Sequence, residues 1–234
     1  MSVGPPPVAA EHGGCEDARV RRVLVVPGLA VRGYADLAVG ALRAAGLDAE
    51  LLDPPAWRTV PADLELYGRQ LGERLREDDR PVAVLIGLSV GTQAAAVAAA
   101  VAGRRVEHLL LVSPTVDPAK RSHRRLLAAW LKGEDHPDSP PLSQQIGDWR
   151  HAGAPRIFRG FSSAVRVRLE DVLPEVAAKI TIVHAEADQL TAHSYAVDLA
   201  ERVGGRLLLV PDAPHSWPIG DAGRFVTLVS ELAA

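Results

Sequence analysis

Residues 82–92, VAVLIGLSVGT, decide the fold because they predict a buried strand that turns sharply into a helix. The residues before Gly87 are uncharged and aliphatic, as in a strand that is covered on both faces. Alanines at 94–96 follow the turn and favour a helix. The chain therefore changes direction within a few residues, and Ser89 lies in that turn.

Ser89 stands between two glycines, Gly87 and Gly91. Without side chains at these positions, a strand and a helix can cross closely, and the serine hydroxyl is exposed above the sheet edge in a strained turn. The following helix directs free N–H groups, first that of Val90, to the region where a tetrahedral intermediate carries negative charge. The alternative is an ordinary strand-to-helix turn in which the serine caps the helix.

Length and composition fit one α/β domain. The 234 residues have a mass of 24.9 kDa, a net charge of -3 and a pI near 6.2, which favour neither nucleic acid nor an anionic membrane as the main partner. The single cysteine, Cys15, can form no internal disulfide, so we expect a reducing compartment and a cytoplasmic location. The sequence predicts no metal and no cofactor.

Two stretches could be mistaken for targeting or membrane segments. Residues 1–20 contain three consecutive prolines and no basic region ahead of an apolar core, so we expect a disordered tail. Residues 81–103 carry no charge and are long enough to span a membrane. Glycines and Ser89 interrupt that run where a strand should give way to a helix, so a buried strand and helix fit it better.

Strands and helices alternate along most of the chain. Strands are predicted at 22–26, at 49–52, before Ser89, and at 106–112, 180–184 and 206–210, and helices at 35–45, 61–77, 193–203 and 222–232. This alternation implies parallel strands with right-handed crossovers. We therefore expect an α/β fold, a three-layer α/β/α sandwich around a mostly parallel sheet of about six strands.

The alternation stops over residues 115–178. This segment is rich in arginine, histidine, proline and aspartate, has helical patches and offers no convincing strand. Long insertions of this kind inside a compact domain are commonly lids or binding elements. We expect one domain over residues 21–234, with a helical cap inserted at about 115–178.

A nucleophilic serine needs a base and an acid that orients the base, and both follow later strands. Asp188 comes after the strand at 180–184, and His215 comes after the last strand. Glu186 is two residues from Asp188, and Asp117 follows the preceding strand, so both remain alternative acids. Without a role in catalysis, the aspartate would be a turn or cap residue and the histidine a surface loop residue.

From residue 22 to the C-terminus the chain resembles the α/β-hydrolase family. The resemblance rests on the nucleophile elbow, Gly87-Leu88-Ser89-Val90-Gly91, on the acid loop before a helix and on the late histidine, all in family order. It implies that Ser89 is the nucleophile, Asp188 the acid and His215 the base. There is no room for the initial antiparallel hairpin of the larger family members.

The resemblance also implies an oxyanion hole. The turn Pro27-Gly28-Leu29 occupies the place of the family's second amide donor, so Leu29 is expected to join Val90 in binding the oxyanion. Pro27 stands where the family usually has histidine. This change removes a hydrogen-bonding side chain but leaves the Leu29 amide.

Acyl transfer to serine, on a small-molecule ester or thioester, is the function that these residues favour. The cap contains Arg121, Arg124 and Arg125 beside Trp130 and several leucines, an amphipathic helix with a basic start. These cations could bind an acidic substrate group, the phosphates of coenzyme A or an acyl carrier, or they could form a solvated helix face. Three alternatives stay open: a non-hydrolytic acyltransferase or cyclase, a hydrolase of carbon–carbon bonds, and a catalytically silent binding protein.

Overall fold

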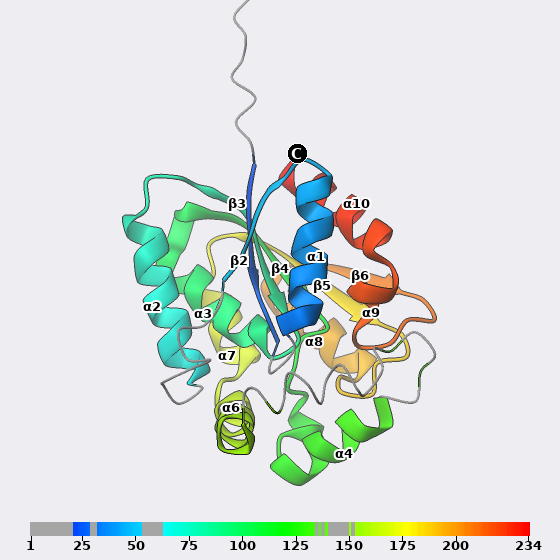
Figure 1. Cartoon of the computed structure of the whole chain (residues 1–234). Helices are drawn as coiled ribbons and strands as arrows, with labels where there is room; N and C mark the ends of the chain where they lie inside the picture. Colours follow the sequence, from blue (N-terminus) through cyan, green and yellow to red (C-terminus); the bar gives the residue numbers. More distant parts are fainter. Residues whose placement is uncertain are drawn as a thin grey trace, which may run out of the picture.

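One sheet runs through the described part of the chain, and every neighbouring pair of its six strands is parallel (Figure 1). The computed structural model describes residues 21–28, 32–52, 63–133 and 153–234, together with His136, Ser139 and Arg150. The predicted tail at residues 1–20 lies outside this part. The strands are β1 (Arg22–Val26), β2 (Asp48–Leu51), β3 (Val82–Leu88), β4 (Val106–Val112), β5 (Lys179–Ala185) and β6 (Arg206–Val210).

The strand order is β2-β1-β3-β4-β5-β6, so β3, which leads to Ser89, lies in the interior of the sheet. All its residues are buried, and their side chains alternate between the two faces. Leu85 packs with the core on one face, and Val84 and Ile86 pack on the other. This double burial explains the uncharged sequence of the strand.

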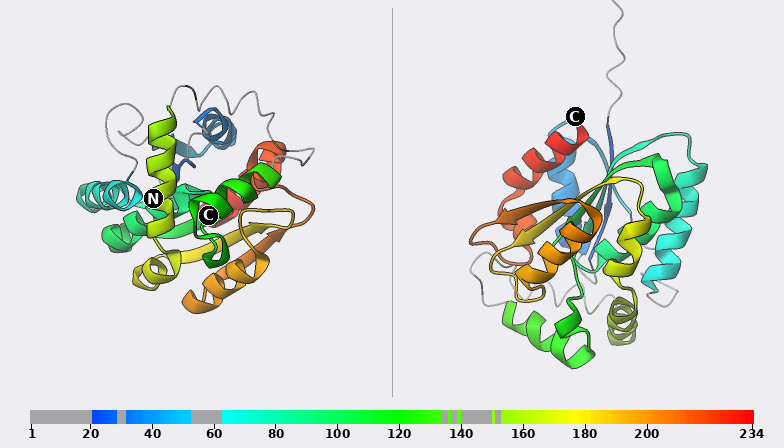
Figure 2. Two further views of the ribbon diagram at one scale, coloured as in Figure 1. Left: turned by 90° about the horizontal axis from the view of Figure 1, so that it is seen from below. Right: turned by 180° about the vertical axis from the view of Figure 1, so that it is seen from behind.

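Helices cover both faces of the sheet (Figures 1 and 2). In chain order they are α1 (Arg32–Ala44), α2 (Leu64–Glu77), α3 (Gly91–Ala102), α4 (His123–Gly133), α6 (Ala154–Arg166), α7 (Leu169–Val172), α8 (His193–Val203), α9 (Trp217–Gly220) and α10 (Ala222–Ala233), with 3₁₀ turns at Gly103–Arg105, Pro118–Lys120 and Leu173–Glu175. Helices α2, α3, α7 and α8 pack on one face, and α1, α9 and α10 pack on the other. The predicted three-layer α/β/α sandwich is confirmed.

The helix boundaries follow from local sequence. Asp63 caps α2, since its carboxylate accepts hydrogen bonds from the backbone N–H groups of Glu65 and Leu66. Helix α8 ends at Gly204, whose φ of 58° lies in the left-handed region that favours glycine. The predicted strands and helices in the described residues agree with the observed ones to within a few residues at their ends.

The described residues of the predicted cap segment lie in two different places. Helices α4 and α6 lie beyond the carboxyl ends of the strands, where Figure 2 (left) shows them crossing the sheet edge. Leu169 and Leu173, by contrast, are buried in the core cluster that contains α3 and α8 residues. Helix α7 and the following turn therefore belong to the layer against the sheet, because apolar side chains at this spacing complete the core under β5.

The uncharged run at residues 81–103 forms β3 and α3, as predicted. Both are buried inside the domain. Within the described part of the chain, no helix combines the length and the apolar character that a membrane span requires.

Candidate active site

Ser89 sits in a strained turn between β3 and α3. Its φ of 52° is in the left-handed region, which costs a residue with a side chain about 1–2 kcal/mol. A Cβ atom at Gly87 would lie 2.5 Å from the Cα of Thr92, and one at Gly91 would lie 2.3 Å from the carbonyl oxygen of Pro27. Both glycines are therefore required by close backbone approach, as the pattern around Ser89 predicted.

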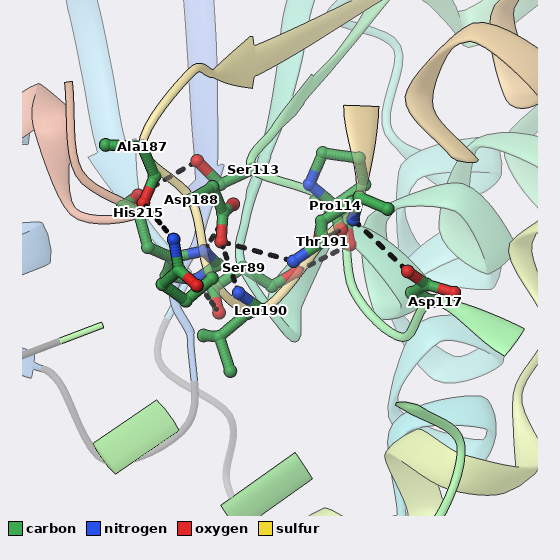
Figure 3. Close-up of polar contacts among 12 residues, drawn as sticks. Ser89, Ser113, Pro114, Asp117, Ala187, Asp188, Leu190, Thr191 and His215 are labelled. Carbon is green, nitrogen blue, oxygen red and sulfur yellow. Dashed lines mark hydrogen bonds and ion pairs between the residues drawn. The ribbon is translucent and has the colours of Figure 1, made fainter. Parts of the chain in front are cut away.

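Ser89, His215 and Asp188 form one line of hydrogen bonds (Figure 3). The Oγ of Ser89 lies 2.7 Å from Nε2 of His215, and Nδ1 of His215 lies 2.8 Å from Oδ2 of Asp188. With Nδ1–H donating to the carboxylate, Nε2 is the acceptor that faces the serine hydroxyl. This tautomer is the one that a general base needs.

The carboxylate of Asp188 is fixed from its other side. Its side chain is fully buried, and Oδ1 accepts hydrogen bonds from the backbone N–H groups of Leu190 at 2.7 Å and Thr191 at 3.2 Å. These two bonds hold the side chain in one rotamer. Asp188 can therefore orient His215 without turning away from it.

The two alternative acids lie in other environments. Glu186 is exposed, and its Oε2 accepts a hydrogen bond from the backbone N–H of Asp212. Asp117 is buried, but its two carboxylate oxygens accept from the N–H groups of Ala119 and Ala192. Neither carboxylate contacts the histidine, so the geometry selects Asp188 among the three candidates.

One of the two predicted oxyanion donors can be placed. The Val90 N–H follows Ser89 at the start of α3, and it makes no hydrogen bond within the described part of the chain. Val90 is thus available to bind a developing oxyanion. The second predicted donor, Leu29, lies outside the described residues.

Ser113 is a site residue that sequence reasoning missed. It directly follows β4, the neighbour of β3, and its φ of 49° matches the strained conformation of Ser89. Its buried Oγ donates a hydrogen bond of 2.9 Å to the backbone carbonyl of His215. Ser113 therefore fixes the loop that carries the base, a role that the dipeptide Ser113-Pro114 does not reveal in the sequence.

Further hydrogen bonds join the loops after β4 and β5. The hydroxyl of Thr191 donates to the carbonyl of Pro114, the Lys120 ammonium donates to the carbonyl of Gln189, and Asp117 binds the amide of Ala192. Figure 3 shows part of this set around the acid loop. These contacts hold the loop that carries Asp188 on its C-terminal side.

Arg121, predicted to bind substrate, is used inside the protein. Its guanidinium lies 2.7 Å from the carboxylate of Glu170 and donates to the carbonyl of Val116, and both charged side chains are largely buried. Tyr195 donates a second hydrogen bond to Glu170. Arg121 therefore joins the start of the cap segment to α7, and its role in substrate binding stays a prediction.

The pKa values around Glu170 fit this network. Burial opposes ionisation of Glu170, but hydrogen bonds from its own backbone amide, Arg121 and Tyr195 outweigh it and hold its pKa below the usual value. Burial, followed by the adjacent Glu170 charge, raises the pKa of Tyr195 above its usual range. The pair is therefore a carboxylate and a neutral phenol at neutral pH.

The other predicted substrate residues of the cap differ from Arg121. Arg125 donates to the carbonyl of Ala119 and is exposed, and Arg124 is exposed. The side chain of Trp130 lies outside the described residues. The basic start of α4 thus retains two exposed cations rather than three.

A second histidine lies close to the acid. His184 is buried near the end of β5, and its ring centroid is 5.4 Å from that of His193. Burial lowers the pKa of His184, although the Asp188 charge acts in the opposite direction. His184 is therefore neutral at pH 7 and adds no positive charge beside the contact between Asp188 and His215. In the part of the chain that the structure describes, no cluster of potential ligands could hold a metal ion.

Solved structures supply the comparison for this fold. A lipase-esterase related protein from Clostridium acetobutylicum has a TM-score of 0.73 at 15% identity, over 91% of this chain and 94% of its own. Bromoperoxidase from Bacillus anthracis has a TM-score of 0.71 at 17% identity, over 91% of each chain. The enol-lactonase from Burkholderia xenovorans LB400 has a TM-score of 0.67 at 15% identity, over 93% and 92%.

No protein-family profile and no curated protein sequence matches the chain. The structural likeness extends over nearly the whole domain at low identity, so it defines the fold. The chain has the α/β-hydrolase fold.

Proposed function

We propose that this protein is a serine hydrolase that cleaves a carboxylic ester or thioester through an acyl-enzyme on Ser89. The observation that carries the proposal is the continuous hydrogen-bonded line from Ser89 Oγ through His215 to the buried carboxylate of Asp188. An isolated serine hydroxyl is a weak nucleophile at neutral pH, and this arrangement removes its proton as it attacks.

The reaction follows from the geometry. Nε2 of His215 takes the Ser89 proton while Oγ attacks the substrate carbonyl, and the oxyanion receives the hydrogen bond of Val90 N–H. His215 then gives the proton to the leaving alcohol or thiol, and the acyl group stays on Ser89. A water molecule, activated by the same histidine, releases the acid and restores the serine.

The structural neighbours support hydrolysis as the class of reaction. Their names include an esterase-related protein and a lactonase, and these activities open carbon–oxygen ester bonds. An aspartate replaces the serine in relatives that open epoxides or displace halide, so this chain fits acyl transfer better. We place ester cleavage ahead of thioester cleavage, because Arg121 is paired with Glu170 and fewer cap cations are free for an anionic carrier.

A panel of substrates tests the proposal. Wild type and Ser89→Ala are compared on p-nitrophenyl esters of increasing acyl length, on neutral acyl thioesters and on coenzyme A thioesters. We expect turnover of esters by wild type and none above background by the variant, with unchanged thermal unfolding.

Two other outcomes would contradict the proposal. Equal rates for wild type and Ser89→Ala would remove the serine from the chemistry. No turnover of any substrate by folded wild type, even with an added alcohol as acceptor, would favour a catalytically silent binding protein over both a hydrolase and an acyltransferase.

Kinetics of a cap variant at several ionic strengths decides between simple esters and carrier-linked substrates. Neutralising Arg124 and Arg125 together should leave neutral ester kinetics unchanged. A rise in KM confined to coenzyme A thioesters, weakening with ionic strength, would instead assign these two cations to an anionic part of the substrate.

A further inference from the structure

A basic cavity lies at the amino ends of the strands, whereas Ser89 lies at their carboxyl ends. It surrounds the start of β5, at the amino ends of the strands, and has a volume of about 540 Å³. Figure 1 shows this edge near the C-terminus, far from the cap helices. Cavities of roughly 300–1,000 Å³ are typical of small-molecule sites.

Strand register brings the polar groups of this cavity together. His108 of β4 pairs with Lys179 of β5, and Thr181 of β5 pairs with Arg206 of β6. Alternate residues of a strand point to the same face, so Lys179 and Thr181 share one face. His108 and Thr181 hydrogen-bond to each other at 2.9 Å and form a polar floor.

The cations of the cavity are not neutralised by the protein. Lys179, Arg202 and Arg206 are exposed and line it, and none forms an ion pair within the described part of the chain. No aspartate or glutamate is among the described residues that line it. The carboxylate next to His108, Glu107, pairs with Arg21.

The pKa of His108 is consistent with the positive charge of the cavity. Burial, and then the charges of Lys179 and Arg206, lower the pKa of His108. The two cations therefore act on the same half-buried imidazole. An anion between them would relieve their repulsion and make the imidazolium easier to form.

An apolar side chain completes the wall. Leu232 of α10 lines the cavity on the face of the sheet that carries His108 and Thr181, and it is only partly buried. A ligand can thus place charge against the cations and carbon against Leu232. We propose that this cavity binds a small phosphate-bearing molecule, with its phosphate held by Lys179 and Arg206 and its apolar part against Leu232.

Phosphate is the anion that this set favours. A guanidinium offers paired N–H donors that match phosphate oxygens, and an ammonium adds a point charge. Arg202, at the end of α8, supplies a third cation at the rim. The site lies away from the catalytic residues, so it stands or falls independently of the proposed hydrolase activity.

Titration of the full chain with inorganic pyrophosphate tests the proposal. Binding is measured by calorimetry, and the histidine side chains are followed by NMR, with His108→Gln identifying the His108 signal. We expect a Kd below about 1 mM and a rise in the pKa of His108 when pyrophosphate binds.

Charge-matched variants provide the control. Lys179→Gln with Arg206→Gln should weaken pyrophosphate binding at least roughly tenfold and cancel the response of His108. Arg104→Gln with Arg168→Gln removes the same charge from two exposed arginines elsewhere and should leave Kd within about twofold of wild type, since net charge alone adds little.

Three results would overturn the site. They are an unchanged His108 signal at saturating pyrophosphate, equal weakening in both double variants, and no binding by wild type. Labelling of Ser89 by an active-site probe should be the same in all these proteins, so failure of the anion site and failure of the hydrolase proposal are distinguished.

Discussion

Two serines with the same strained backbone stand at the ends of neighbouring strands, and only one is placed to react. Ser89 directly follows β3 and has a φ of 52°, and Ser113 directly follows β4 and has a φ of 49°. The hydroxyl of Ser89 faces Nε2 of His215. The hydroxyl of Ser113 instead donates to the backbone carbonyl of His215. Strain alone therefore does not make a nucleophile, and the partner of the hydroxyl decides its role.

The surroundings of the two serines explain this difference. Ser89 precedes a helix whose first free N–H groups can stabilise an oxyanion, and it is partly exposed. Ser113 is buried, precedes a proline and has no helix after it. The turn at Ser89 leaves its hydroxyl accessible to a substrate. The turn at Ser113 can only support the loop that carries His215.

Replacing the two serines by alanine should separate their roles most strongly. Ser89→Ala is expected to reduce kcat for an ester by about 10⁶-fold, because the attacking oxygen is lost. Steady-state kinetics measures the fall in kcat, and thermal unfolding checks that the purified variants are folded. A residual rate within about tenfold of wild type would mean that another group attacks.

Loss of the acid should rank next. Asp188→Asn should lower kcat by about 10⁴-fold with the fold intact, since the amide favours the wrong tautomer of His215. Glu186→Gln and Asp117→Asn serve as matched controls and should each stay within about tenfold of wild type. A reversed ranking would transfer the orienting role to another loop.

Ser113→Ala should have a smaller effect on rate. Without the bond to the His215 carbonyl, the base can shift by a fraction of an ångström, and kcat should fall by up to about 10²-fold with KM unchanged. Ser230→Ala, on α10 and remote from the triad, is the control. An unchanged kcat in Ser113→Ala would show that the loop needs no support from β4.

The smallest expected effect concerns backbone strain. Glycine adopts a positive φ freely, so Ser89→Gly should be about 1 kcal/mol more stable than Ser89→Ala, and the same difference should separate Ser113→Gly from Ser113→Ala. Chemical denaturation of the four variants gives these values. A difference in stability between the glycine and alanine variants at only one of the two serines would show that the two turns are not equally strained.

The sequence predicted the parts of the site that depend on local pattern. The glycines around Ser89 are needed within a single turn, and Asp188 and His215 follow strands whose carboxyl ends must meet at one sheet edge. The parallel strands and the three layers follow from the same alternation. Hydrophobic periodicity and turn residues carry this information directly.

What the sequence could not predict depends on contacts between distant segments. The pairing of Arg121 with Glu170 joins residues 49 positions apart, and the bond from Ser113 to His215 joins residues 102 positions apart. Nor did composition reveal that Leu169 and Leu173 complete the core, because they follow a long polar segment. Such partners are chosen by packing in three dimensions rather than by neighbours in the chain.

Reaction with a fluorophosphonate, followed by intact mass and peptide mapping, tests the account most directly. A triad serine attacks tetrahedral phosphorus as it attacks a carbonyl, so one adduct should form, on Ser89 and not on Ser113. His215→Ala should abolish the adduct without unfolding the protein. Folded wild type that stays unlabelled, or carries its adduct on another residue, would contradict the claim that Ser89 is the nucleophile.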